Sequence, residues 1–163
     1  MTTSQPDLRL LFAHPVHFLA FGFGSGLAPK APGTFGTLLG LPLFAALLLV
    51  PESLHLAVIA LLFLAGIPIC QKAGDTLGVS DHSGIVWDEI VAMLLVLEFT
   101  PAAWPWWIAA FALFRLFDIW KPAPIRHFDA RLKGGFGVMF DDLLAALYAI
   151  AALWLLQWLI LHY

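Results

Sequence analysis

Cysteine and charged residues are both scarce in this sequence of 163 residues. Its single cysteine, Cys70, has no partner in the chain, which excludes a scaffold held together by internal disulfide bonds. Only 12% of the residues are charged, and eight Lys and Arg against eleven Asp and Glu give a net charge of -3. So few basic residues disfavour nucleic-acid binding. The low charge also disfavours intrinsic disorder, which is typical of highly charged and weakly apolar chains.

Apolar residues, by contrast, are abundant. They make up 61% of the chain, against roughly 45–50% in an ordinary soluble domain. The mean hydropathy is +0.90, and the chain contains seven Trp and fourteen Phe. A protein of this size cannot bury so much apolar surface within itself. We therefore expect a single domain, residues 1–163, that is embedded in a membrane.

Four long stretches contain no Asp, Glu, Lys or Arg: residues 31–51, 53–71, 99–114 and 143–163. Three of them are near twenty residues, the length of a helix that crosses about 30 Å of hydrocarbon. The short segments at 51–53 and 100–101 contain proline and small polar residues, which are typical of turns between paired helices. These features predict an all-α, polytopic membrane bundle of about four to five apolar helices with polar, glycine-rich connections.

The basic residues predict which way the bundle faces. Six of the eight occupy the longer connections, at Lys30, Lys72, Lys121, Arg126, Arg131 and Lys133, whereas the turns at 51–53 and 99–104 contain neither Lys nor Arg. By the positive-inside rule, the long connections face the cytoplasm and the short turns and the C-terminus lie outside. The candidate reactive residues would then share the cytoplasmic face of the membrane.

Residues 22–37 form the first polar stretch, which is rich in glycine and leads into an apolar helix. It matches neither the Walker P-loop nor the dinucleotide-binding motif, because Gly-Lys-Ser/Thr is absent and the glycine spacing differs. Thr34 is a suitable N-cap, and with Lys30 nearby the free amide groups at the helix start would suit an anion. A capped, glycine-rich turn without any ligand explains the same pattern.

The second stretch places Asp88 and Glu89 side by side at the start of an apolar helix. The helix macrodipole favours negative charge there, which is an explanation that needs no ligand. Adjacent helical residues point about 100° apart. We therefore expect that the two carboxylates cannot both face one centre unless one of them precedes the regular helix.

The third stretch covers residues 115–142. Arg115, Asp118 and Lys121 are spaced by three and share a face if the helix continues that far, as a binding site or as an ion-pair ladder at the membrane edge. The glycines at 134, 135 and 137 predict a tight turn or a close backbone approach before the last helix. The pair Asp141-Asp142 is then expected to open that helix.

Most acidic residues lie in or beside the two long inward connections: Asp75, Asp81, Asp88, Glu89, Asp118, Asp129, Asp141 and Asp142. Carboxylates next to hydrocarbon are costly unless they are paired or bind a metal. An oxygen-only set of ligands suits Mg²⁺ rather than zinc. Lysines and arginines between these acids are suited to hold a phosphate.

Four motifs, at residues 26–37, 85–90, 114–125 and 134–142, resemble those of the phosphatidylglycerophosphatase A family and occur in the family's order. The resemblance extends from about residue 18 to the last helix. It implies an all-helical, Mg²⁺-dependent phosphomonoesterase that converts phosphatidylglycerophosphate to phosphatidylglycerol in phospholipid biosynthesis, at the cytoplasmic face of the bacterial inner membrane. Thr37 stands where the family has Ser, and Ala123 where a bulky aromatic is frequent; neither change removes an ionisable group.

Absent motifs narrow the reaction class independently. The sequence has no Cys-x5-Arg loop, no Asp-x-Asp pair and no Pro-Ser-Gly-His box, which other phosphatases use as nucleophile sites. Metal-assisted attack by water remains, and an aspartyl-phosphate intermediate stays open.

These observations together predict the site. The expected catalytic residues are Asp88, Asp118 and Asp142. The expected metal ligands are Asp88, Glu89, Asp118, Asp141 and Asp142, and the expected substrate-binding residues are Lys30, Thr34, Thr37, Arg115, Lys121, Arg126 and Lys133. Three points stay open. They are which acid binds the metal directly, whether Asp81 or His82 protonates the leaving alcohol, and the oligomeric state.

Two other function classes use similar residues. A small ion-coupled transporter or channel would use Asp88, Asp118 and Asp142 as intramembrane ion ligands and would need a polar outward vestibule. The outward turns carry little beyond Glu52, Ser53, Glu98 and Thr100. A lipid transferase would need an Asp-Gly…Asp…Asp array, which is absent. The phosphatase is therefore the favoured interpretation.

Overall fold

The computed structural model describes residues 6–162, and within this range the chain forms helices and no strands. The predicted all-helical fold is confirmed. In chain order the elements are α1 (Leu8–Ala13), α2 (Pro15–Ala20), the 3₁₀ helix η1 (Gly22–Leu27), α3 (Pro32–Leu47), the 3₁₀ helix η2 (Glu52–Leu54), α4 (His55–Leu77), α5 (Trp87–Glu98), α6 (Trp104–Trp120), α7 (Ile125–Arg131) and α8 (Gly134–His162).

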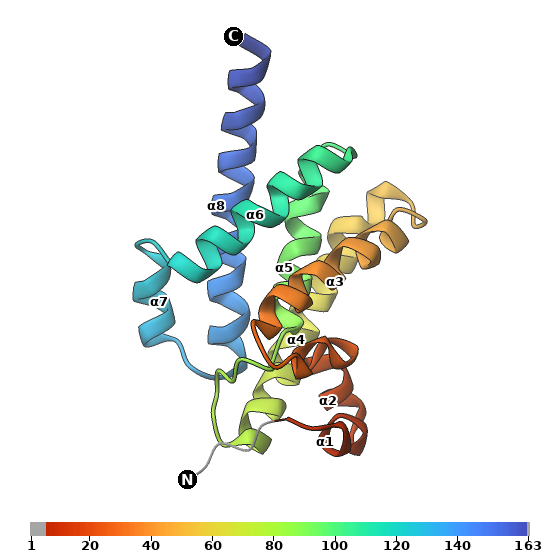
Figure 1. Ribbon diagram of the computed structural model, residues 1–163, viewed down its shortest axis with the longest axis vertical. Helices are drawn as coiled ribbons and strands as arrows, with labels where there is room; N and C mark the ends of the chain where they lie inside the picture. Colours follow the sequence, from red (N-terminus) through yellow and green to blue (C-terminus); the bar gives the residue numbers. More distant parts are fainter. Residues whose placement is uncertain (1–5, 163) are drawn as a thin grey trace.

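Helices α5 and α8 form the centre of the bundle (Figure 1). Helix α8 packs against α4, α5 and α6, and α5 packs on its other side against α3. The core side chains of α5, such as Met93 and Leu97, are fully buried. A Cβ atom on Gly135 would lie 1.9 Å from the carbonyl oxygen of Ile67, so only glycine lets α8 approach α4 this closely. A close backbone approach was predicted at this glycine, but it occurs inside α8 and not before the last helix.

Both predicted turns are present, but only the second joins helices that pack on each other: α5 packs against α6, whereas the main partner of α3 is α5. Residues 48–54 connect α3 to α4, and residues 99–103 connect α5 to α6. The two turns are joined at the start of α4, where His55 Nδ1 lies 3.0 Å from Glu98 Oε2 and His55 Nε2 lies 2.9 Å from the Val50 carbonyl oxygen. Figure 1 shows these turns and the C-terminus toward one end of the bundle, and the N-terminal helices and the 78–86 connection toward the other.

Among the described residues, two segments are long and apolar enough to cross a membrane: Glu52–Leu77 and α8. This is fewer than the four to five predicted. Helices α3, α5 and α6 have 16, 12 and 17 residues, and at about 1.5 Å per residue none reaches the roughly 30 Å of a hydrocarbon core.

Three helix boundaries differ from the sequence-based expectations. Thr34 is not an N-cap, because α3 begins at Pro32, whose fixed φ suits a first helical turn, and Ala31 is the N-cap residue. Helix α6 ends at Trp120, and Lys121 adopts a left-handed conformation (φ 44°), because the following Pro122 disfavours a helical residue before it. Lys121 therefore leaves the face shared by Arg115 and Asp118.

The third boundary concerns the last helix. Helix α8 begins at Gly134, not at the acidic pair, so Asp142 lies about two turns inside it. Gly134 has a φ of +74°, a conformation that glycine adopts without strain. The helix can start this early because the glycines that follow allow it to lie directly on α4.

Candidate active site

Three carboxylates from α5 and α8 converge in the interior of the bundle. One oxygen each of Asp88, Glu89 and Asp142 lies within 4.8 Å of the others, and we call these three residues the carboxylate cluster. Asp88 and Asp142 are only 7% and 3% exposed. Asp88 Oδ1, Glu89 Oε2 and Asp142 Oδ2 are buried and have no hydrogen-bond partner. Buried carboxylates that repel one another are unfavourable without a compensating cation.

The expectation that Asp88 and Glu89 could not face one centre is wrong. Both residues lie in the first turn of α5, and both contribute an oxygen to the carboxylate cluster. The side chain of Glu89 is one methylene longer than that of Asp88, which lets its carboxylate reach around the helix.

The carboxylate cluster fits a magnesium ion. Its potential ligands are all oxygens, which Mg²⁺ prefers, and several are unpartnered. Cys70, the one cysteine of the chain, is buried beside Met139 and is not part of the cluster. The donor set is therefore unlike that of a zinc site.

Arg115 of α6 connects the carboxylate cluster to its surroundings. One of its terminal nitrogens lies 3.6 Å from Glu89 Oε1 and forms an ion pair with Asp118. The same nitrogen lies 3.5 Å from Thr37 Oγ1, and the hydroxyl of Thr37 donates to the Gly33 carbonyl oxygen at 2.8 Å. The Nε atom of Arg115 is buried without a partner. Arg115 thus neutralises two carboxylates and keeps one donor free.

Gly33, at the start of α3, brings the backbone of the first glycine-rich stretch against these groups. A Cβ atom at this position would lie 2.1 Å from Glu89 Oε1 and 3.2 Å from the Arg115 terminal nitrogen. Only a glycine leaves room for both side chains. Gly33 was not among the predicted site residues, although it lies within the motif at 26–37, directly before Thr34.

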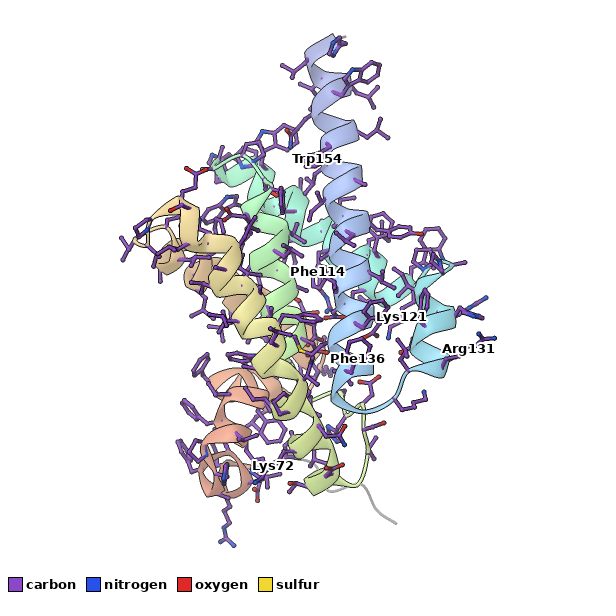
Figure 2. All side chains as sticks on the ribbon, turned by 180° about the vertical axis from the view of Figure 1, so that it is seen from behind. Lys72, Phe114, Lys121, Arg131, Phe136 and Trp154 are labelled. Carbon is purple, nitrogen blue, oxygen red and sulfur yellow. The ribbon has the colours of Figure 1, made fainter. Side chains whose placement is uncertain are left out.

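A second group of charges lies beside the carboxylate cluster and centres on Lys121. Its amino group forms ion pairs with Asp141 and, at 2.9 Å, with Asp129. Partial burial lowers the pKa of Lys121, but the hydrogen bonds to Asp141 and Asp129 outweigh burial and raise the pKa above its ordinary value. Figure 2 shows Lys121 next to α8, with Arg131 of α7 pointing away from the bundle.

Asp141 is thus not brought into the carboxylate cluster, although it was an expected metal ligand. It faces Lys121, because adjacent residues of α8 point in different directions. Asp118 is also outside the three-residue cluster and pairs with Arg115.

Comparison with known proteins decides the family. The family model described as Phosphatidylglycerophosphatase A matches residues 18–157. The chain belongs to the phosphatidylglycerophosphatase A family. The resemblance found in the four motifs is confirmed.

Two relatives in this family are named Phosphatidylglycerophosphatase A. The protein from Haemophilus influenzae is 49% identical over 160 residues, which cover 97% of this chain and 98% of the relative. The protein from Escherichia coli K12 is 41% identical over 147 residues, 90% of this chain and 86% of the relative. No solved structure matches the chain significantly.

The remaining predicted substrate-binding residues of this phosphatidylglycerophosphatase A family member are on the surface. Lys30, Arg126 and Lys133 are exposed, and Thr34 is half-buried. Lys133 donates to the Asp129 carbonyl oxygen at 3.1 Å, which ties it to the Lys121 group. Of the two candidate proton donors, Asp81 is exposed, whereas His82 is buried and its Nδ1 accepts from the Gly84 amide at 3.0 Å. The substrate contacts of these residues stay predictions.

Proposed function

We propose that the chain hydrolyses phosphatidylglycerophosphate to phosphatidylglycerol and inorganic phosphate with the help of Mg²⁺. Family membership makes it a phosphoric monoester hydrolase. The observation that carries the proposal is the carboxylate cluster, in which each of three carboxylates has a buried, unpartnered oxygen near the Arg115 guanidinium. A site of this composition suits a divalent cation and a phosphate group together.

Asp88, Glu89 and Asp142 are the residues that would hold Mg²⁺. The ion would supply positive charge for the phosphoryl oxygens and lower the pKa of water in the site. Asp118 acts on the cluster through Arg115, with which it pairs. Water attack and an aspartyl-phosphate intermediate are both compatible with this arrangement.

Arg115 is the residue best placed to bind the phosphate. Its Nε atom is the free donor beside the carboxylate cluster, and a guanidinium binds phosphate oxygens with good geometry. Lys121 contributes positive charge from the neighbouring group, and its raised pKa keeps it charged at neutral pH. Lys30, Arg126 and Lys133 are exposed and suit the anionic headgroup or the anionic membrane surface.

The proposal places the enzyme in the bacterial inner membrane with the site toward the cytoplasm. Two segments have the length and composition of membrane spans. Large apolar side chains also lie on the outer surface: Leu49, Leu61, Trp104 and Leu161 are 88%, 66%, 75% and 80% exposed. Water is a poor solvent for such a surface, whereas lipid is a good one.

The transporter alternative has less support. Both relatives described above are named as phosphatases over nearly the whole length of the chain. The acids that a transporter would use as ion ligands are the same ones that the phosphatase needs, so no separate group of residues requires a second function.

Phosphate release from phosphatidylglycerophosphate in mixed micelles tests the proposal. We expect release by the purified protein, loss of release with EDTA, and recovery when excess Mg²⁺ is added. EDTA saturated with Mg²⁺ beforehand is the control and should not inhibit. Full activity in metal-free buffer would contradict the role of Mg²⁺, and no release under any condition would contradict the function itself.

A further inference from the structure

An apolar groove lies between α4, α5 and α8. It encloses about 380 Å³, within the range of small-molecule pockets. Asp88 is the one charged residue among those that line it, and the other walls are aliphatic, aromatic or thioether side chains. The groove therefore combines a surface suited to hydrocarbon with a single contact to the carboxylate cluster.

The groove runs along the helices. On α4 it is lined by Leu56, Ala60 and Leu64, which are four residues apart and lie on one helix face. This face extends over about 12 Å at 1.5 Å per residue. On α5 it is lined by Asp88, Ala92 and Leu95, again on one face. The groove thus follows the long direction of the bundle.

Asp88 marks the end of the groove at which the chemistry is proposed. It lies in the first turn of α5, and from there α5 leads toward the 99–103 turn at the opposite end of the bundle (Figure 1). Its Oδ1 atom is buried and unpartnered, and the same residue belongs to the carboxylate cluster. A lipid whose phosphate lies at the cluster therefore has the mouth of the groove beside it.

A second apolar groove provides a comparison within the same molecule. It encloses about 260 Å³ between α3, α4 and α5 and is lined by Leu43, Val58 and Leu62 among others. No residue of the carboxylate cluster is among its lining residues. Apolar character alone is thus common to both grooves, and contact with the cluster distinguishes the first.

We infer that the groove between α4, α5 and α8 holds one acyl chain of the lipid substrate during phosphate release. This inference rests on the proposed function. The groove begins at Asp88 of the carboxylate cluster and runs along α5 toward the 99–103 turn, which suits an acyl chain that extends away from a phosphate held at the cluster. The small side chains of Ala60 and Ala92 leave the space that a chain of methylenes fills.

Two variants on α4 test the inference. Ala60→Phe narrows the groove from an exposed position, so that the core of the bundle keeps its packing. Val58→Phe places the same aromatic side chain in the second groove and is the control. Each protein is assayed on dipalmitoyl and on dihexanoyl phosphatidylglycerophosphate in the same mixed micelles, and its melting temperature is measured.

We expect the wild type to have the higher kcat/KM for the long-chain lipid. Ala60→Phe should reduce that preference at least about tenfold while kcat/KM for the short-chain lipid stays within about twofold. Val58→Phe should keep the wild-type preference. Leu64→Trp, which also narrows the groove from an exposed position, replaces Ala60→Phe if that variant melts early.

The other outcomes overturn the inference. Three results would each show that the groove does not hold the acyl chain. They are an unchanged preference of Ala60→Phe for the long-chain lipid, an equal change of this preference in both variants, and a wild type that does not prefer the long-chain lipid. A wild type that releases phosphate from neither lipid would instead contradict the proposed function, so the two failures are distinguishable.

Discussion

Asp141 and Asp142 are neighbours in α8 but belong to different groups of charges. Asp142 faces Asp88 and Glu89, whereas Asp141 forms an ion pair with Lys121. Asp142 also lies about two turns inside α8. The helix macrodipole acts mainly within the first turn, so it does not account for a buried carboxylate at this position.

Asp142→Asn should therefore strongly reduce turnover without unfolding the protein. Loss of one electrostatic contact to a transition state costs about 2.7–4 kcal/mol, so we expect at least about a hundredfold lower kcat. Mg²⁺ should raise the melting temperature of the wild type and not that of the variant. We expect the same loss of turnover for Asp88→Asn and Asp118→Asn, the other two predicted catalytic residues. Phosphate release and thermal melting with and without Mg²⁺ are the measurements.

Two variants serve as controls for Asp142→Asn. Glu52→Gln changes an exposed acid in the 48–54 turn and should affect neither turnover nor melting. Asp141→Asn should lower the melting temperature, because Lys121 loses a partner, but should keep the response to Mg²⁺. If Asp142→Asn stays active, or loses activity only in proportion to folded protein, the catalytic assignment is wrong.

Gly33→Ala should damage the site through steric conflict. The added methyl group would meet Glu89 Oε1 at 2.1 Å, so the carboxylate or the start of α3 must move. We expect turnover per folded molecule to fall at least about tenfold, because small displacements of catalytic groups have large effects on rate.

Gly78→Ala separates this steric effect from backbone strain. Gly78 has a φ of +71° and no atom within 4 Å of an added Cβ. Its replacement should cost about 1–2 kcal/mol of stability and leave turnover per folded molecule unchanged. Equal activity of Gly33→Ala and wild type would show that Glu89 needs no defined position.

Lys121→Met should lower stability across the neutral pH range. The folded-state pKa of Lys121 is raised, so its ion pairs contribute fully below the unfolded-state pKa of about 10.4 and are lost as the pH rises through the folded-state value. The difference in melting temperature between wild type and variant should thus be constant from neutral to mildly alkaline pH and narrow only above about pH 10.4. A difference that disappears by mildly alkaline pH would contradict the pairing with Asp141 and Asp129.

The distribution of Lys and Arg predicts the sidedness of the chain. A reporter inserted in the 51–53 turn should be detected outside the cytoplasm, and one in the 122–134 connection inside it. Alkaline phosphatase and green fluorescent protein fusions provide opposite readouts at each position. Detection of both positions on the same side would overturn the predicted topology and the cytoplasmic placement of the site.

The sequence alone determined the helical class and the positions of the turns. Long uncharged stretches and the proline-containing segments at 51–53 and 100–101 are local features, and the structure has a turn at each place. The predicted pairing is confirmed for α5 and α6, whereas α3 packs mainly against α5 instead of α4. The motifs likewise identified the family, because four of them occur in order along the chain. Asp88, Glu89 and Asp142 were also among the predicted metal ligands.

Only the tertiary structure decided which charges meet. The start of α8 and its rotation against α5 determine whether Asp141 or Asp142 faces Asp88. Gly134 and Gly135 set this start and this rotation through their contact with α4. The separation of Lys121 from Arg115 depends on the end of α6 at Trp120, and the role of Gly33 depends on a contact between α3 and α5. Such relations join residues far apart in the chain, and side-chain packing selects them after the local helical preferences have been satisfied.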